Sequence, residues 1–182
     1  TYGARPGERC GDLTVLHEFE EKLRAQFVPA AINRGAYYMS NWLGMLDLVR
    51  DRGTLPSFFP ADFAFPMVAP EDLGELAARR LLEPARETGL RYLEGPRRYT
   101  PRDVADAFSE ALGATVEVAT IPREAWEDTF VQFGFSKSAA QSYACMTSTV
   151  VDDEAEWPDD PERGTTTLRD YIRRAVNQGG RP

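Results

Sequence analysis

The sequence predicts an α/β fold, because stretches with the spacing of strands alternate along the chain with stretches that have the spacing of amphipathic helices. Apolar residues make up 42% of the 182 residues and aromatic residues 11%, which is enough for a buried core. About three or four strands can be counted, fewer than a parallel sheet covered on both faces usually contains. We therefore expect part of the sheet to lie outside this stretch of chain.

The first part of the chain predicts a helix, a strand and a second helix. The first helix is expected over residues 12–27, where apolar residues recur at helical spacing and Asp12 is a suitable N-cap. A short buried strand is expected over 28–35. A loop then leads into an apolar helix over 36–53, which should end at Gly53.

Prolines and glycines divide the middle of the chain. Residues 54–70 are rich in proline and aromatic side chains, which predicts a loop that ends in a short strand, FPMVA. A helix is expected over 70–84, with proline at both ends, acids in its first turn and arginines late. A strand over 89–96 and a helix over 100–113 follow, and that helix has Thr100 as N-cap and a glycine as C-cap.

The last part of the chain predicts mostly helices. Alternating residues over 115–122 predict a strand. Helices are expected over 123–134 and 136–151, followed by an acidic loop over 152–164 and a closing helix over 166–176.

Charge and cysteine content exclude several classes of protein. The net charge is −8 with a pI of about 4.8, and the arginines lie scattered beside acids, so we predict no direct nucleic-acid binding. No apolar run reaches 18 residues, so no membrane span is expected. Cys10 and Cys145 lie far apart and outside any C-x-x-C pair. One disulfide is an alternative, but two free thiols in a reducing cytoplasm are the favoured prediction.

The residue types present also exclude common cofactor motifs. One histidine and no Cys/His cluster argue against a metal site. Glycine-rich phosphate-binding patterns and the G-x-S-x-G nucleophile motif are absent from these residues. The single histidine, His17, lies one helical turn before Glu20, and a carboxylate there would fix its tautomer for proton donation. The alternative is a half-exposed histidine without a role.

The segment AINRGAYYMSNW, residues 31–42, concentrates groups that bind or pack. Arg34 follows an apolar strand, and its guanidinium needs an anion, for which Glu20 on the preceding helix is the candidate. Such a pair would tether helix to strand. Gly35 permits close approach of backbone or ligand. The aromatic residues that follow either pack in the core or line a site, since ligands of open α/β sheets bind beyond the carboxyl ends of strands.

Several motifs in a fixed order resemble the NmrA-like branch of the atypical short-chain dehydrogenases. The resemblance covers about residues 1–176 and rests on HEFEEKLR, AINRGAYYMSNW, RDRGTLPSFFP, FPMVAPEDLGELAARRLLEP and YLEGPRRYTPRDVADAFSEALG. It implies the carboxyl-terminal part of a doubly wound Rossmann-like sheet plus a small α/β substrate lobe. Residues 1–53 would form the late Rossmann helix–strand–helix, and residues 54–182 the lobe with a returning strand, as one structural unit. The glycine-rich first turn and strands one to five would precede Thr1.

The resemblance also implies a function and a set of site residues. The intact protein would be an NAD(P)H-dependent reductase acting on a small quinone-like or carbonyl acceptor, whereas this segment alone should bind no dinucleotide. The cofactor-binding residues would be Tyr2, Gly3, Arg34, Gly35 and Ala36. The substrate-binding residues would be Tyr37, Tyr38, Asn41, Trp42, Phe58 and Phe133. The Tyr-x-x-x-Lys pair of the wider family is absent, because Leu13 and His17 hold its two positions. Whether the protein is an enzyme therefore stays open. His17 is the candidate catalytic donor.

The alternative function is a non-catalytic NAD(P)-sensing regulator that binds a protein partner. Its acidic segments at 152–156 and 159–162 would suit a basic partner, although a solvated loop is the favoured explanation for them. A structural remnant with an exposed sheet edge, which would dimerise, is the third alternative.

Overall fold

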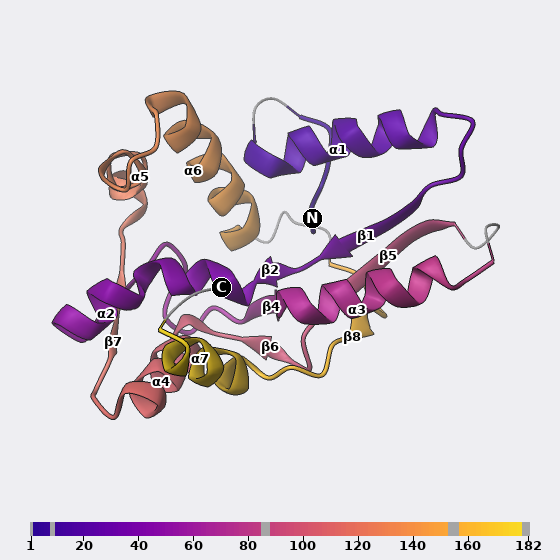
Figure 1. Ribbon diagram of the computed structural model, residues 1–182. Helices are drawn as coiled ribbons and strands as arrows, with labels where there is room; N and C mark the ends of the chain where they lie inside the picture. Colours follow the sequence, from indigo (N-terminus) through magenta and orange to yellow (C-terminus); the bar gives the residue numbers. More distant parts are fainter. Residues whose placement is uncertain (1, 8–9, 85–87, 153–156, 180–182) are drawn as a thin grey trace.

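The computed structural model describes residues 2–7, 10–84, 88–152 and 157–179. Parallel strands covered by helices confirm the predicted α/β class (Figure 1). The first sheet has the order β1-β5-β8, all parallel, with Gly35 opposite Leu93. Its strands are β1 (Ala31–Gly35), β5 (Gly89–Glu94) and β8 (Glu162–Arg163). In the view of Figure 1, α1 (Gly11–Arg24) lies above the β1–β5 pair and α3 (Pro70–Leu81) below it.

The chain continues from the end of β1 into the second sheet. This sheet has the order β2-β4-β6, and β2 runs parallel to β4 while β6 runs antiparallel to it. Its strands are β2 (Tyr37–Tyr38), β4 (Phe65–Val68) and β6 (Arg98–Tyr99). The 3-10 helix η1 (Met39–Met45) and α2 (Leu46–Arg52) follow β2, and α2 ends at left-handed Gly53 as predicted.

A third parallel pair joins β3 (Thr54–Ser57) to β7 (Glu117–Thr120). The remaining helices are α4 (Pro101–Leu112), η2 (Arg123–Ala125), α5 (Trp126–Gln132), α6 (Lys137–Val151) and α7 (Leu168–Asn177). The predicted ends of α4 are confirmed, because Thr100 and Asp103 form a capping box and Gly113 adopts a left-handed conformation.

Two clusters of buried side chains hold these layers together. The larger lies among η1, β3, β4, α4 and α7, and its most buried members include Leu55, Phe65 and Phe108. The smaller contains Tyr2, Ala36, Val68, Leu76 and Leu93, and so lies beneath the carboxyl ends of β1 and β5. This smaller cluster fixes the part of the molecule where the sequence predicts a site.

The short strands were the main omission of the sequence prediction. Eight strands occur in the described parts of the chain, more than the three or four expected. β3 lies in the predicted loop 54–70, and β8 in the predicted acidic loop. Both form by pairing with a distant strand rather than through their own pattern, and β3 contains Pro56, which a strand at a sheet edge tolerates.

Backbone hydrogen bonds cross the predicted boundary at residue 53, because β1 pairs with β5 and β2 with β4. The division into 1–53 and 54–182 stays a prediction. Where the structure describes the chain, we find no helix that is both long enough and apolar enough for a membrane.

The start of α1 and the cysteines correct two predictions. α1 begins at Gly11, so its N-cap is Cys10 rather than Asp12. Cys10 is bonded to Cys145 in a disulfide, with 5.3 Å between the two Cα atoms, so the prediction of two free thiols was wrong. The two cysteines meet because α1 packs against α6, a contact across 135 positions that spacing along the chain does not reveal.

Candidate functional site

Two pairs of predicted cofactor residues meet at the carboxyl ends of β1 and β5. Tyr2 and Gly3 come from the start of the chain, and Gly35 and Ala36 come from the end of β1. The backbone amide of Tyr2 donates to the carbonyl of Gly35 at 3.3 Å, and the amide of Ala36 donates to the carbonyl of Leu93 at 3.0 Å. Tyr2, Gly3, Gly35 and Ala36 are all buried. A Cβ on Gly35 would lie 3.0 Å from the Tyr38 ring, so the glycine allows this ring to pack closely against the strand.

The predicted ion pair between Arg34 and Glu20 is present and buried. Arg34 Nε donates to Glu20 Oε1 at 2.8 Å, and Nη2 donates to Oε2 at 2.7 Å. The same guanidinium donates to Tyr92 Oη at 2.9 Å and to the carbonyl of Ala4 at 3.3 Å. Arg34 therefore ties together α1, β5 and the N-terminal segment.

Protonation of this pair follows from its geometry. The hydrogen bond to Glu20 is the main reason that the pKa of Arg34 is raised. Burial alone would raise the pKa of Glu20, but the hydrogen bonds and charge of Arg34 outweigh burial and lower that pKa. Both groups are thus held in their charged forms.

Tyr2 and Glu94 form a second buried polar group beside this junction. Glu94 is fully buried and its Oε2 accepts from Arg163 Nη1 at 2.7 Å. Burial, and then the Glu94 carboxylate, raise the pKa of Tyr2 well above its usual value, so its hydroxyl keeps its proton. Tyr2 Oη and Glu94 Oε1 are buried and make no hydrogen bond of normal length among the described residues, although Arg98 Nη2 lies 3.8 Å from Oε1. Sequence reasoning missed Glu94, whose signal was an acid at the end of an apolar strand just before Gly95.

His17 lies half-buried on the face of α1 that points toward the sheet. The face is identified by Leu13 and Glu20, which are both buried and lie one turn to either side of His17. The carboxylate of Glu20 accepts hydrogen bonds from Arg34 and from Arg24, at 3.0 Å for the latter. The hydrogen bonds described for the Glu20 carboxylate go to these two arginines, and the role of His17 as a donor stays a prediction.

The predicted substrate residues after β1 divide between core and surface. The ring of Tyr37 packs edge-on against Phe59 at 5.6 Å and Phe65 at 5.4 Å, and Trp42 lies 5.8 Å away. Burial raises the pKa of Tyr37 to about 12, against the effect of a hydrogen bond with Asn41. Tyr38 and Asn41 are exposed, whereas Trp42 is buried. Trp42 thus belongs to the larger core cluster, and the partly buried Tyr37 packs against it.

Phe58, just after β3, and Phe133, the C-cap of α5, lie in a second group of aromatic rings around α5. Phe58 stacks on Phe130 with 4.1 Å between ring centroids and meets Phe133 edge-on at 6.2 Å. Its neighbour Phe59 belongs to the group around Tyr37. The dipeptide Phe58–Phe59 therefore links the two groups of predicted substrate residues into one aromatic zone.

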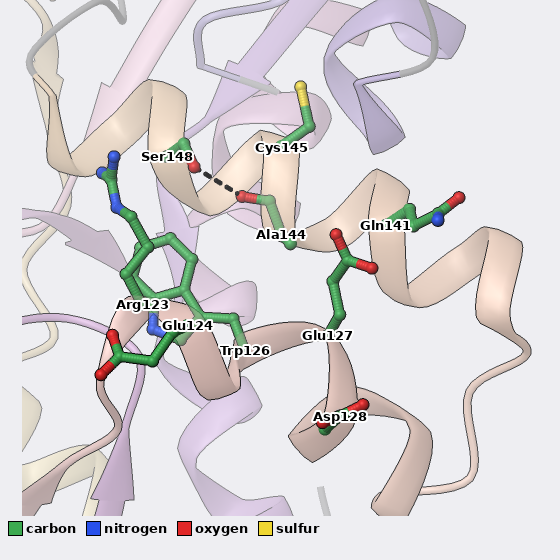
Figure 2. A pocket seen from close by; sticks show the side chains of 9 residues that line it. All are labelled: Arg123, Glu124, Trp126, Glu127, Asp128, Gln141, Ala144, Cys145 and Ser148. Carbon is green, nitrogen blue, oxygen red and sulfur yellow. Dashed lines mark hydrogen bonds between the residues drawn. The ribbon is translucent and has the colours of Figure 1, made fainter.

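A cavity of about 500 Å³ opens between α5 and α6 (Figure 2). Its lining residues are Arg123, Glu124, Trp126, Glu127, Asp128, Gln141, Ala144, Cys145 and Ser148. None of the residues predicted from the sequence lines it, but Trp126 lies 6.4 Å from Phe58. Three acids against one arginine make the cavity unsuited to phosphate. Its position depends on how two helices pack, which explains why sequence reasoning did not find it.

Solved structures resemble this chain over most of its length. Triphenylmethane reductase from Citrobacter sp. superposes with a TM-score of 0.73 at 19% identity, over 91% of this chain and 59% of that chain. The NADPH-dependent quinone oxidoreductase from Escherichia coli gives a TM-score of 0.68 at 17% identity, over 92% and 63%. NmrA, a negative transcriptional regulator solved in complex with NAD, gives 0.56 at 16% identity, over 88% and 56%. At these identities the likeness shows the fold.

The chain spans about three fifths of the length of the solved structures that it matches. A comparison with curated protein sequences finds no match. The model of the NmrA-like family matches residues 16–171, which is most of the chain. The chain therefore belongs to the NmrA-like family.

Proposed function

We propose that the intact protein is an NAD(P)H-dependent reductase that acts on a small quinone-like or carbonyl acceptor. The observation that supports this best is the meeting of the Tyr2–Gly3 segment with Gly35–Ala36 at the carboxyl ends of β1 and β5. Ligands of open α/β sheets bind at this edge. The quinone oxidoreductase of Escherichia coli has also been solved with NADPH, and the Citrobacter reductase with NADP(H).

The residues of this chain suit the nicotinamide end of the cofactor. Gly35 has no side chain and Ala36 only a methyl group, while the Gly35 carbonyl is already bonded to Tyr2 and the Ala36 amide to Leu93. The buried Tyr2 Oη and Glu94 Oε1, which make no hydrogen bond of normal length, offer polar contacts at the same junction. Arg34 acts through Glu20, by holding α1 against β1. The phosphates need a glycine-rich cradle that these residues lack, so this chain alone should bind no dinucleotide.

When bound, the reduced nicotinamide would supply hydride, and this chain would supply a proton and an apolar surface. His17 is the candidate proton donor, since Leu13 stands where the wider family has its tyrosine. The aromatic zone would take a flat acceptor, with Phe133 as its exposed member and the exposed Tyr38 and Asn41 as further contacts close to Tyr37 in the chain. Tyr37, Trp42 and Phe58 would shape the zone from within.

The test is oxidation of NADPH and NADH by the full-length protein with a panel of quinones and carbonyl compounds. Replacing His17 by Ala should lower kcat by about 10²–10⁴-fold, the usual contribution of general acid catalysis. Glu18→Gln, on the exposed side of the same helix, is the matched control and should leave the rate unchanged. The absence of cofactor oxidation with every acceptor, or equal rates in the His17 variant, would contradict the proposal.

The second candidate is a regulator that senses the redox state of NAD(P) and binds a protein partner, as the fold of NmrA suggests. The acidic segments offered for a basic partner include residues 153–156, which lie outside the described residues. Of the described acids, Asp152 pairs with Arg123, and Glu162 with Arg79. A pull-down whose yield changes between oxidised and reduced cofactor would favour this candidate, and turnover above background would exclude it.

A further inference from the structure

We propose that the Cys10–Cys145 disulfide is a reversible redox staple between α1 and α6, opened by a dithiol that attacks the sulfur of Cys145. The term redox staple denotes this one covalent bond and the two helices that it joins. The proposal rests on three features of its surroundings: unequal exposure of the two cysteines, the position of Cys10 at a helix N-terminus, and the contacts that remain after the bond opens.

The two cysteines differ in their access to a reductant. Cys10 is 6% exposed, whereas Cys145 is an exposed residue of α6 that lines the cavity between α5 and α6. Figure 2 shows the sulfur of Cys145 pointing away from the acidic side chains of that cavity. Thiol–disulfide exchange requires access of the thiolate to the sulfur that it attacks. Of the two cysteines, Cys145 is therefore the residue that a reductant reaches from solvent.

The buried sulfur is placed to be a good leaving group. Cys10 is the N-cap of α1, a helix of 14 residues; its side chain makes no capping hydrogen bond, but the helix dipole stabilises a thiolate at this end of the helix. Its Sγ lies 3.6 Å from Thr149 Oγ1, and that hydroxyl accepts a hydrogen bond from Arg5 Nη2 at 3.2 Å. A positive charge thus lies one hydroxyl away. A lower thiol pKa makes a thiol leave faster, so attack at Cys145 with release of Cys10 is favoured.

The exchange balances with a dithiol as the reductant. One thiolate of the reagent bonds to Cys145 Sγ while the bond between the two cysteines breaks, and Cys10 leaves as a thiolate. The second thiolate of the reagent then attacks the reagent's own sulfur in the mixed disulfide and releases Cys145. The protein gains two electrons and two protons, and the reagent becomes a cyclic disulfide.

Opening the bond should loosen α6 without detaching it. The amide of Gly11 donates to Ser142 Oγ at 2.6 Å, and the hydrogen bond from Arg5 to Thr149 also joins the two sides. A Cβ on Gly11 would lie 3.3 Å from the carbonyl of Ser142, so the helix start and α6 are in close contact. Because α6 packs on α5, opening the redox staple would also loosen the packing around the cavity and around the aromatic ring of Phe130.

The experiment treats the native protein with glutathione and with dithiothreitol, without denaturant, and maps alkylated and glutathionylated cysteines by mass spectrometry. We expect glutathione to form a mixed disulfide on Cys145, and dithiothreitol to expose both thiols and speed amide exchange in α6. Arg5→Gln should slow the release several-fold, Arg5→Lys should restore it, and Arg169→Gln, whose arginine pairs with Glu110 elsewhere on the molecule, is the control.

Three results would overturn the proposal. Reduction that requires denaturant would make the bond a purely structural one. A mixed disulfide on Cys10 would reverse the assigned direction of attack. Alkylation of both cysteines in the air-oxidised native protein would mean that the bond is absent. The mapping on the unsubstituted protein decides these cases even if a variant fails to fold.

Discussion

Arg34 and Glu20 are the residues for which sequence and structure agree most directly. A guanidinium next to an apolar strand needs an anion, and the acid on the preceding helix was the nearest candidate. Glu94 was missed, and the disulfide was only the less favoured alternative, because the partners come from distant segments: Arg163 for Glu94 and Cys145 for Cys10. A charged residue whose partner lies on the neighbouring element of the sequence can therefore be predicted, whereas a pairing with a distant segment cannot.

Glu20→Ala should lower the free energy of unfolding by about 3–5 kcal/mol, because it leaves the buried Arg34 guanidinium without its carboxylate. Urea denaturation measures the change. Glu21→Ala is the matched control on the same helix: its carboxylate is 58% exposed and pairs with Arg24, so its loss should be below about 1 kcal/mol. Equal losses of stability in the two variants would show that the buried ion pair contributes no more than the exposed one.

Lowering the pH distinguishes the electrostatic contribution of the Arg34–Glu20 pair to stability from the contribution of its packing. Since the folded pKa of Glu20 is lowered, its contribution is complete above the unfolded carboxyl pKa, about 4.3, and is lost as pH falls through the folded value. The stability difference between the unsubstituted protein and Glu20→Gln should therefore shrink below about pH 4. A difference that stays constant with pH would assign the effect to shape rather than to charge.

The elements that carry their own boundary signals were predicted well. α3, α4 and α6 lie close to the expected ranges because prolines, capping residues and glycines mark their ends. The short strands β3 and β8 carry no such signals and exist through their partners. Element boundaries are therefore predictable where the chain itself satisfies the terminal backbone groups.

Gly113→Ala should destabilise the protein by about 1 kcal/mol, since Gly113 has φ of 65° at the end of α4 and a side chain is strained there. A Cβ at this position meets no atom within 4 Å, so the cost comes from backbone conformation and not from a clash. Gly44→Ala is the control, because Gly44 also has free space but no positive φ. Thermal melts should show a loss for the first variant only, and a loss of equal size in both would refute the conformational argument.

At the scale of the whole molecule, the order of motifs predicted the family and the fold, while the relation of α5 and α6 to the rest was not predictable. The motifs include β1, α3, β5 and α4, and their order along the chain can be read directly from the sequence. α6 is brought to α1 by packing, and with it come the cavity and the disulfide. Hydrophobic periodicity predicts that such a helix forms, but it does not predict which element the helix packs against.

The disulfide gives a molecular-scale prediction, because it closes a loop of 135 residues and so restricts the unfolded chain strongly. Cys145→Ser should lower the free energy of unfolding by about 2–5 kcal/mol, toward the upper end for so long a loop. Urea denaturation with and without dithiothreitol provides an internal control: reductant should bring the unsubstituted protein down to the stability of the variant and leave the variant unchanged. If the variant is as stable as the oxidised protein, the crosslink does not hold α1 and α6 together, and the contacts of Gly11 and Arg5 with α6 suffice.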